Sequence, residues 1–188
     1  MSKPKDARDR LFRYGRPNIR PIVLKEDDGI GGDMRYLWAA YRKGSFSQLG
    51  DVSQEEFTQD ILTILTPYEW VWMIEDKNHL YPDGYGPVGI MVARFNGWEM
   101  EPHFMSFPWA TPRNKVKSVV AFMQMARYEK GVGVLNVYSG DEDKDFFKHL
   151  GKRYGVMYYV GKIPRGGYGD DKYVFYGRGG SFFKGMHS

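Results

Sequence analysis

The segment from Asn96 to Tyr138 constrains the fold more than any other part of the chain, because several strong local signals follow one another in it. Asn96-Gly97 lies between two strand-like runs, and this dipeptide in that setting predicts a hairpin of two antiparallel strands. Thr111-Pro112 then supplies a helix N-cap and the proline favoured at the first helical position. Residues 133–138 read as a buried strand, so the order of strand, helix and strand predicts a right-handed parallel crossover.

The start of this expected helix is a candidate anion site. Unpaired backbone N–H groups and the positive end of the helix dipole favour a phosphate there. Arg113, Lys115 and Lys117 would add positive charge at the same place. The same side chains also fit the solvated face of an amphipathic helix, so these residues by themselves leave both interpretations open.

The rest of the chain adds further helices and strands. Residues 53–66 form the clearest expected helix, because Ser53 and Glu56 have the spacing of a capping box. Two more helices are expected over residues 33–43 and 141–150, the second stopped by Gly151. The expected strands cover residues 19–24, 69–75, 88–95, 98–107, 133–138, 156–163 and 172–177, and a Gly-rich loop at 164–171 joins the last two.

Length and composition indicate one globular domain. The chain has 188 residues, of which 42% are hydrophobic and 16% aromatic, enough for a sizeable core. Cysteine is absent, which excludes disulfides, thiolate metal sites and a cysteine nucleophile. There is no apolar run long enough to span a membrane and no apolar core of a secretory signal, so we expect a cytoplasmic protein. The histidines are too scattered to predict a metal site: His79, His103, His149 and His187.

Positive charge is concentrated at the N-terminus. Residues 1–25 hold eight basic side chains against Asp6 and Asp9, a balance of +6, whereas the whole chain carries +4. We expect residues 1–18 to form a basic arm. Such an arm can bind nucleic acid through residues 3–25, or an acidic protein surface, and it can equally be a solubilising terminus.

The order of elements over residues 19–179 resembles the GNAT superfamily of acyl-CoA-dependent N-acyltransferases. The resemblance implies an α/β (α+β) fold with a mostly antiparallel central sheet, helices on both faces and one parallel β-α-β crossover, followed by a tail at 180–188. In that family an Arg/Gln-x-x-Gly-x-Gly/Ala loop opens the central helix, and its backbone amides bind the pyrophosphate of coenzyme A. The matching stretch from Arg113 to Ser118 keeps the arginine and the small last residue, but Val116 replaces the central glycine. A β-branched residue there crowds an approaching phosphate.

The resemblance implies acetyl-CoA or another acyl-CoA as cofactor and an amine-bearing substrate as acceptor. The cofactor-binding residues that it implies surround the start of the central helix: Phe107, Trp109, Arg113, Asn114, Lys115, Val116, Lys117 and Ser118.

A candidate catalytic base lies on the strand before that helix. Glu99, Glu101 and His103 alternate there, so the strand period places all three on one face. The family often carries a glutamate on this strand that accepts a proton from the substrate amine, and a carboxylate beside a histidine can have a pKa suited to that task. The alternative is a strand with one solvated face. Pro102 fits an edge or a bulge in such a strand.

Two functions follow from these residues. An active protein would transfer an acyl group to an amine with Glu101 or Glu99 as base, and backbone N–H groups near residues 106–109 would hold the oxyanion. A protein that kept the fold without the chemistry is favoured by Val116 and by Phe147, which stands where many family members have a tyrosine that protonates the departing thiolate. Small, Cys-free, Gly- and aromatic-rich chains of this kind resemble bacteriophage proteins. The second hypothesis is therefore a virion component whose basic arm contacts protein subunits or nucleic acid.

Overall fold

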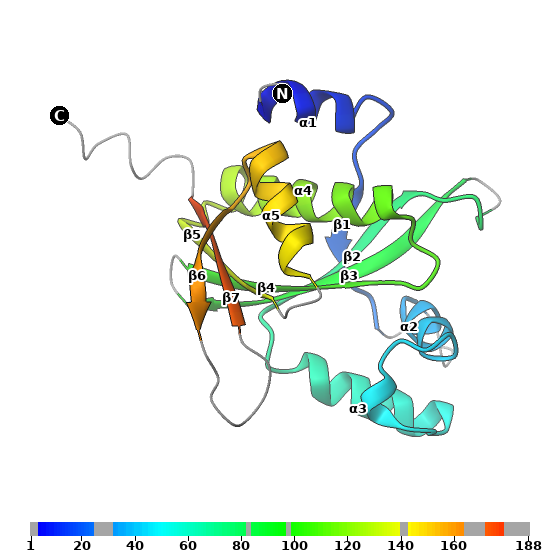
Figure 1. The fold of residues 1–188 in the computed structure, drawn as a ribbon. Coiled ribbons are helices and arrows are strands. Elements are labelled where there is room, and N and C mark those ends of the chain that lie inside the picture. The colour runs from blue at the N-terminus through cyan, green and yellow to red at the C-terminus, as the bar shows by residue number, and fades with distance from the viewer. Residues whose placement is uncertain are drawn as a thin grey trace. The chain divides into compact units, whose positions relative to one another are not determined.

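The structure is a computed structural model that describes residues 4–24, 32–81, 84–96, 99–139, 143–163 and 172–178. Its elements are, in chain order, α1 Pro4–Leu11, β1 Asn18–Pro21, α2 Met34–Tyr41, the 3₁₀ helix η1 Ser47–Leu49, α3 Gln54–Leu65, β2 Trp70–Lys77, β3 Tyr85–Asn96, β4 Glu99–Ser106, α4 Pro112–Tyr128, β5 Val134–Ser139, α5 Lys144–Tyr154, β6 Tyr158–Ile163 and β7 Lys172–Arg178 (Figure 1).

Seven strands form a mixed sheet in the order β1-β2-β3-β4-β5-β7-β6. β4 and β5 pair in parallel, with Glu99 opposite Val134. The pairs β1–β2, β2–β3, β5–β7 and β6–β7 are antiparallel. The expected fold class, mostly antiparallel with one parallel β-α-β crossover, is therefore confirmed.

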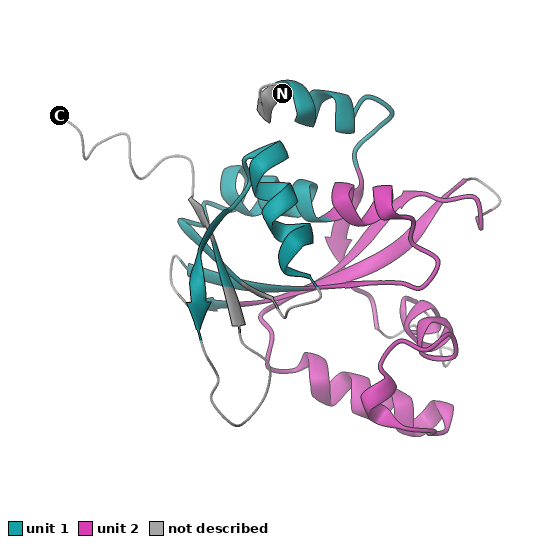
Figure 2. Ribbon diagram, viewed as in Figure 1, with its two compact units in different colours: residues 1–16, 95–103, 119–188 teal, residues 17–94, 104–118 magenta. Residues whose placement is uncertain are grey.

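Contacts divide the chain into two compact units (Figure 2). Unit 1 comprises residues 1–16, 95–103 and 119–188, and unit 2 comprises residues 17–94 and 104–118. The boundaries expected from the sequence, a basic arm at 1–18 followed by one domain at 19–179, stay a prediction.

The core of unit 2 is built by amphipathic helices on apolar strands. On α3, Phe57, Ile61 and Leu65 recur at every fourth position and are all buried, as a helix period requires. They pack in one cluster with buried residues of α2, β2 and β3. The capping box at the start of α3 is confirmed, since Ser53 N donates to Glu56 Oε2 at 2.8 Å and Glu56 N donates to Ser53 Oγ at 3.3 Å.

A charged clamp on Arg20 connects β1, β2 and the start of α2. The Arg20 guanidinium donates to both carboxylate oxygens of Asp33, at 2.6 and 2.7 Å, and to Glu75 Oε1 at 2.8 and 3.0 Å. The Asp33 side chain is only 4% exposed. The hydrogen bonds to Asp33 and Glu75 raise the pKa of Arg20 above its ordinary value, so the guanidinium stays charged.

In unit 1, α5 runs further than the sequence predicts. We expected Gly151 to stop the helix, but α5 continues to Tyr154 and ends at Gly155, which adopts the left-handed conformation at φ 63°. Gly151 has a different role: a Cβ there would lie 2.3 Å from the backbone oxygen of Met157. The glycine permits the close approach of the chain that follows α5, which local sequence does not reveal.

The region expected to be a basic arm contains α1. Ala7 and Leu11 of this helix are buried, and α1 packs on α5 within unit 1 (Figure 1). None of the helices in the described ranges is both long and apolar enough to cross a membrane. Three parts of the sequence interpretation lie outside the described residues: the turn at Gly97, the Gly-rich loop at 164–171 and the tail at 180–188.

Candidate functional site

The start of α4, where the sequence predicts an anion site, carries a local cap formed by Thr111 and Asn114. Thr111 Oγ1 accepts from Asn114 N at 3.1 Å, and Thr111 N donates to Asn114 Oδ1 at 3.0 Å. Lys115 N donates to the Thr111 carbonyl oxygen at 3.1 Å, and Pro112 has no N–H. Thr111 therefore accepts from the N–H of Asn114 through its side chain and from the N–H of Lys115 through its carbonyl. Anion binding at this helix start stays a prediction.

A buried ion pair holds this helix start on β2. The ammonium of Lys117 pairs with Asp76 Oδ1, and both residues are buried. Asn114 Nδ2 donates to Asp76 Oδ2 at 2.9 Å and to the Lys77 carbonyl at 3.0 Å. Asn114 and Lys117, both expected to bind the cofactor, thus contact Asp76, while Arg113 is exposed and Lys115 half-buried.

Asp76 is the residue that sequence reasoning missed. The available signal was a carboxylate near the end of an expected strand that contains the apolar residues Met73 and Ile74. The structure shows both of these residues buried. Such a carboxylate needs a buried partner. The partner lies 41 positions away in the sequence, so only the tertiary structure identifies it.

The remaining predicted residues of the helix start are packed to different degrees. Val116 is half-buried. Ser118 is fully buried, and its Oγ has no hydrogen-bond partner among the described residues. Phe107 is fully buried, and its ring lies 4.9 Å from the ring of Trp109.

Hydrogen bonds to backbone carbonyl groups fix the loop before α4. Trp109 Nε1 donates to the Pro87 carbonyl at 2.8 Å, and Asn78 Nδ2 donates to the Trp109 carbonyl at 2.9 Å. Tyr81 also donates to the Pro87 carbonyl, at 2.8 Å, and partial burial raises the pKa of Tyr81 to about 12, so the phenol stays protonated. Phe107 N donates to the Val88 carbonyl at 2.9 Å. This N–H group is one of those near residues 106–109 that were expected to bind the oxyanion, and in this structure it is already hydrogen-bonded.

The acidic residues expected to supply a base lie on β4. Glu101 Oε1 and His103 Nε2 are 3.3 Å apart, and both side chains are partly exposed, at 36% and 44%. Glu99 lies one strand period before Glu101 and is half-buried. The structure therefore brings Glu101 and His103 together, and a partly exposed carboxylate beside an imidazole can exchange protons with water.

Phe147 occupies an aromatic cluster on α5. Its ring lies 5.3 Å from Phe146 and 5.5 Å from the fully buried Phe175. Phe147, where the sequence resemblance implies a proton donor in related enzymes, thus takes part in aromatic packing in this chain. Among the described residues, no group of three or more His, Asp or Glu side chains could hold a metal ion.

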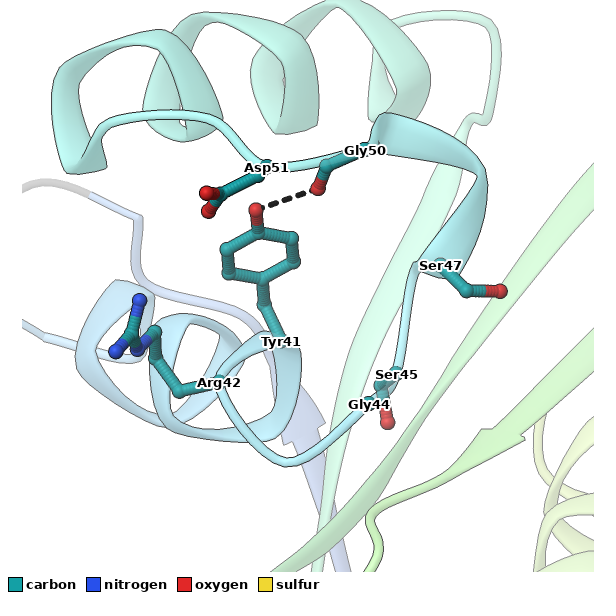
Figure 3. A pocket seen from close by; sticks show the side chains of 7 residues that line it. All are labelled: Tyr41, Arg42, Gly44, Ser45, Ser47, Gly50 and Asp51. Carbon is teal, nitrogen blue, oxygen red and sulfur yellow. Dashed lines mark hydrogen bonds between the residues drawn. The ribbon is translucent and has the colours of Figure 1, made fainter.

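A pocket that the sequence did not predict lies in unit 2 between α2 and α3. It has a volume of about 320 Å³ and is lined by Tyr41, Arg42, Gly44, Ser45, Ser47, Gly50 and Asp51. Figure 3 shows the Tyr41 side chain reaching across the loop to Gly50. Its hydroxyl donates to the Gly50 carbonyl at 2.6 Å and accepts from Val52 N at 2.8 Å. These bonds fix the loop, which contains Phe46 in the left-handed region at φ 57°.

Comparison with known proteins identifies the fold. No protein-family model matches the sequence, and no curated protein matches it. A solved chimera of spermidine N-acetyltransferase SpeG from Vibrio cholerae and hSSAT superposes with a TM-score of 0.62 at 11% identity, over 87% of this chain and 96% of the other. A GNAT-family acetyltransferase from Bacillus anthracis gives 0.61 at 14% identity, over 87% and 95%. At these identities the likeness shows the fold alone: the chain has the GNAT fold.

Proposed function

We propose that this chain is a GNAT-type N-acyltransferase, which moves an acyl group from an acyl-CoA, acetyl-CoA in the simplest case, to an amine. The observation that carries this proposal is the Glu101–His103 pair on β4, because it places a partly exposed carboxylate next to a second titratable group. The GNAT fold supports it, since the similar structures are of N-acetyltransferases.

In the proposed reaction Glu101 removes a proton from the acceptor ammonium, directly or through a water molecule. The neutral amine then attacks the thioester carbonyl and the C–N bond forms. The nitrogen releases its second proton to solvent, the C–S bond breaks, and the thiolate of coenzyme A leaves. Phe147 has no proton to give, so the thiolate is protonated by water. His103, with Nε2 at 3.3 Å from Glu101 Oε1, is the positioning residue for the base, and Glu99 is the second candidate base.

The cofactor is proposed to bind at α4 mainly through charge. Arg113 and Lys115 would contact its phosphates, and Trp109 and Phe107 would border the site. Asn114 and Lys117 would act through Asp76 by holding the helix start, while Val116 and Ser118 limit the space there. Because the Thr111 cap engages backbone N–H groups, we expect affinity to fall steeply as salt increases.

The deciding experiment is calorimetric titration with acetyl-CoA and desulfo-CoA at moderate salt, followed by an amine screen. Glu101→Gln should reduce turnover about 10²- to 10⁴-fold, the usual contribution of a general base, and leave cofactor affinity unchanged. Glu129→Gln removes an exposed carboxylate just after α4 and is the control that should retain turnover. Glu99→Gln tests the second candidate base. Loss of turnover in Glu99→Gln but not in Glu101→Gln, or in neither variant, would contradict the role given to Glu101.

A second candidate function is a protein that uses the GNAT fold for assembly without chemistry, such as a virion component. It is favoured by the engagement of Lys117 with Asp76 and of backbone N–H groups with Thr111. If acetyl-CoA does not bind at millimolar concentration, this candidate replaces the first. Reversing the exposed charges of α1 and its extension, with Arg10→Glu and Arg13→Glu, would then be expected to abolish association with the partner subunit or nucleic acid.

A further inference from the structure

A second cavity lies in unit 1, where α5 ends and β6 begins. Its volume is about 380 Å³, within the range of small-molecule sites. It is lined by Lys148, Gly151, Lys152, Gly155, Met157, Tyr158 and Tyr159. Figure 1 shows α5 leading directly into β6, the last strand in the sheet order. The proposed acyl transfer uses none of these lining residues.

Two glycines give the cavity its form. Gly155 adopts the left-handed conformation that ends α5, and its N–H donates to the Gly151 carbonyl at 2.9 Å. Gly151 approaches the backbone of Met157 so closely that a side chain would not fit. The turn is therefore tight, and no side chain projects into the cavity from either glycine.

Aromatic surface borders the cavity on the β6 side. The side chains of Tyr158 and Tyr159 are 58% and 44% exposed. The ring of Tyr159 lies 5.6 Å from the buried ring of Phe175, and the ammonium of Lys148 lies 4.7 Å above the Tyr159 ring centroid. Tyr159 is thus fixed from two sides, while Tyr158 offers the more exposed ring to a ligand.

Positive charge borders the cavity on the helix side. Lys148 and Lys152 lie one helical turn apart on α5, and Arg153 follows them in the same turn. Among the described residues no carboxylate lines the cavity. The lysines and the exposed tyrosine ring together favour a ligand that is anionic and has a flat apolar face.

We propose that this cavity binds a nucleobase together with its neighbouring phosphates, carried either by a single-stranded nucleic acid or by a free nucleotide. Tyr158 stacks on the base, and Lys148 and Lys152 contact two phosphates. Proteins that bind single strands combine these two elements, a basic groove and aromatic rings on which bases stack. The site is separate from the acyl-transfer proposal, which uses other residues.

The experiment titrates the whole 188-residue chain with a fluorescently labelled single-stranded oligothymidylate and, in parallel, with thymidine 3′,5′-bisphosphate, a mononucleotide that carries two phosphates beside one base. Two phosphate contacts predict that the logarithm of the binding constant falls with the logarithm of salt concentration with a slope of about −1.4, since each contact on a single strand contributes about −0.7. Tyr158→Ala should weaken binding at least about fivefold and leave the slope unchanged. Lys152→Ala should weaken binding and flatten the slope by about 0.7.

The matched controls are Tyr128→Ala and Lys130→Ala, which remove an exposed tyrosine and an exposed lysine elsewhere in unit 1. Both should bind as the wild type does, and thermal melting should show all variants folded. Binding of the oligonucleotide but not of the mononucleotide would identify a strand, and binding of both would identify a free nucleotide. No saturable binding of either, or equal loss in Tyr158→Ala and Tyr128→Ala, would overturn the proposal. So would binding that depends on Arg10 and Arg13 of the N-terminal region and not on Lys152.

Discussion

The ammonium of Lys117 on α4 is paired with the carboxylate of Asp76 on β2, and the two side chains are only 6% and 1% exposed. The carboxylate also accepts a hydrogen bond from Asn114 at 2.9 Å. The positive charge of Lys117 and the negative charge of Asp76 neutralise each other in a site that is shielded from water. The pair joins the first two turns of α4 to β2 and removes Lys117 from the cations that face solvent.

Lys117→Met is expected to lower the free energy of unfolding by about 3–5 kcal/mol, because it leaves the Asp76 carboxylate buried and uncompensated. The double variant Asp76→Asn, Lys117→Met removes both charges and should recover most of this loss. Urea unfolding of the single and double variants gives the coupling between the two positions. Lys115→Met, at a half-buried neighbouring lysine, is the control and should change stability by less than about 0.5 kcal/mol. A Lys117→Met variant as stable as the wild type would contradict the buried pair.

Gly151→Ala is expected to destabilise the protein although it replaces glycine inside a helix. The added Cβ would lie 2.3 Å from the Met157 oxygen, and relieving such a clash costs about 1–3 kcal/mol, more than the gain of up to about 1 kcal/mol in helix propensity. Gly161→Ala is the control, because a Cβ there meets no atom within 4 Å. Thermal melting of both variants tests this, and a stabilised Gly151→Ala would show that α5 and the chain after it are not in close contact.

The capping box of α3 predicts a specific pH dependence of stability. Hydrogen bonds from the hydroxyl side chain and backbone of Ser53 hold the pKa of Glu56 below its ordinary value of 4.5. A carboxylate whose pKa is lower in the folded state contributes stability that is fully present above the unfolded-state pKa and is lost as the pH falls through the folded-state pKa. Glu56→Gln should therefore be less stable than the wild type at pH 7, and the difference should vanish on acidification below pH 4.5. Glu55→Gln, on the same helical turn, should show no such convergence.

Val116→Gly tests whether the β-branched side chain at α4 limits cofactor binding. If a phosphate approaches this position, removal of the side chain should tighten acetyl-CoA binding at least about tenfold, the gain from one hydrogen bond to a charged group. The same change should cost about 1 kcal/mol of stability, because glycine is unfavourable in a helix. Val116→Ala, which keeps helix propensity, separates the two effects. Unchanged affinity in both variants would mean that Val116 does not border the cofactor.

The sequence by itself determined the features that depend on local spacing. The α3 cap follows from Ser53 and Glu56 three positions apart, and the crossover around α4 follows from its proline start and the apolar run after it. Glu101 and His103 meet because side chains two positions apart on a strand share a face. In each case residues close in the chain carry the whole signal, so periodicity and capping rules are enough.

Only the tertiary structure determined which buried polar groups pair with one another and which glycines are required by close packing. Asp76 and Lys117 are distant in sequence, and no local pattern indicates that they form a buried ion pair. Gly151 looks like a helix stop, yet its role comes from the backbone of Met157 after the chain has turned. The cavity between α5 and β6 likewise depends on how two elements pack. Burial and close approach are properties of the packed chain, because they depend on the simultaneous positions of segments that local propensity does not connect.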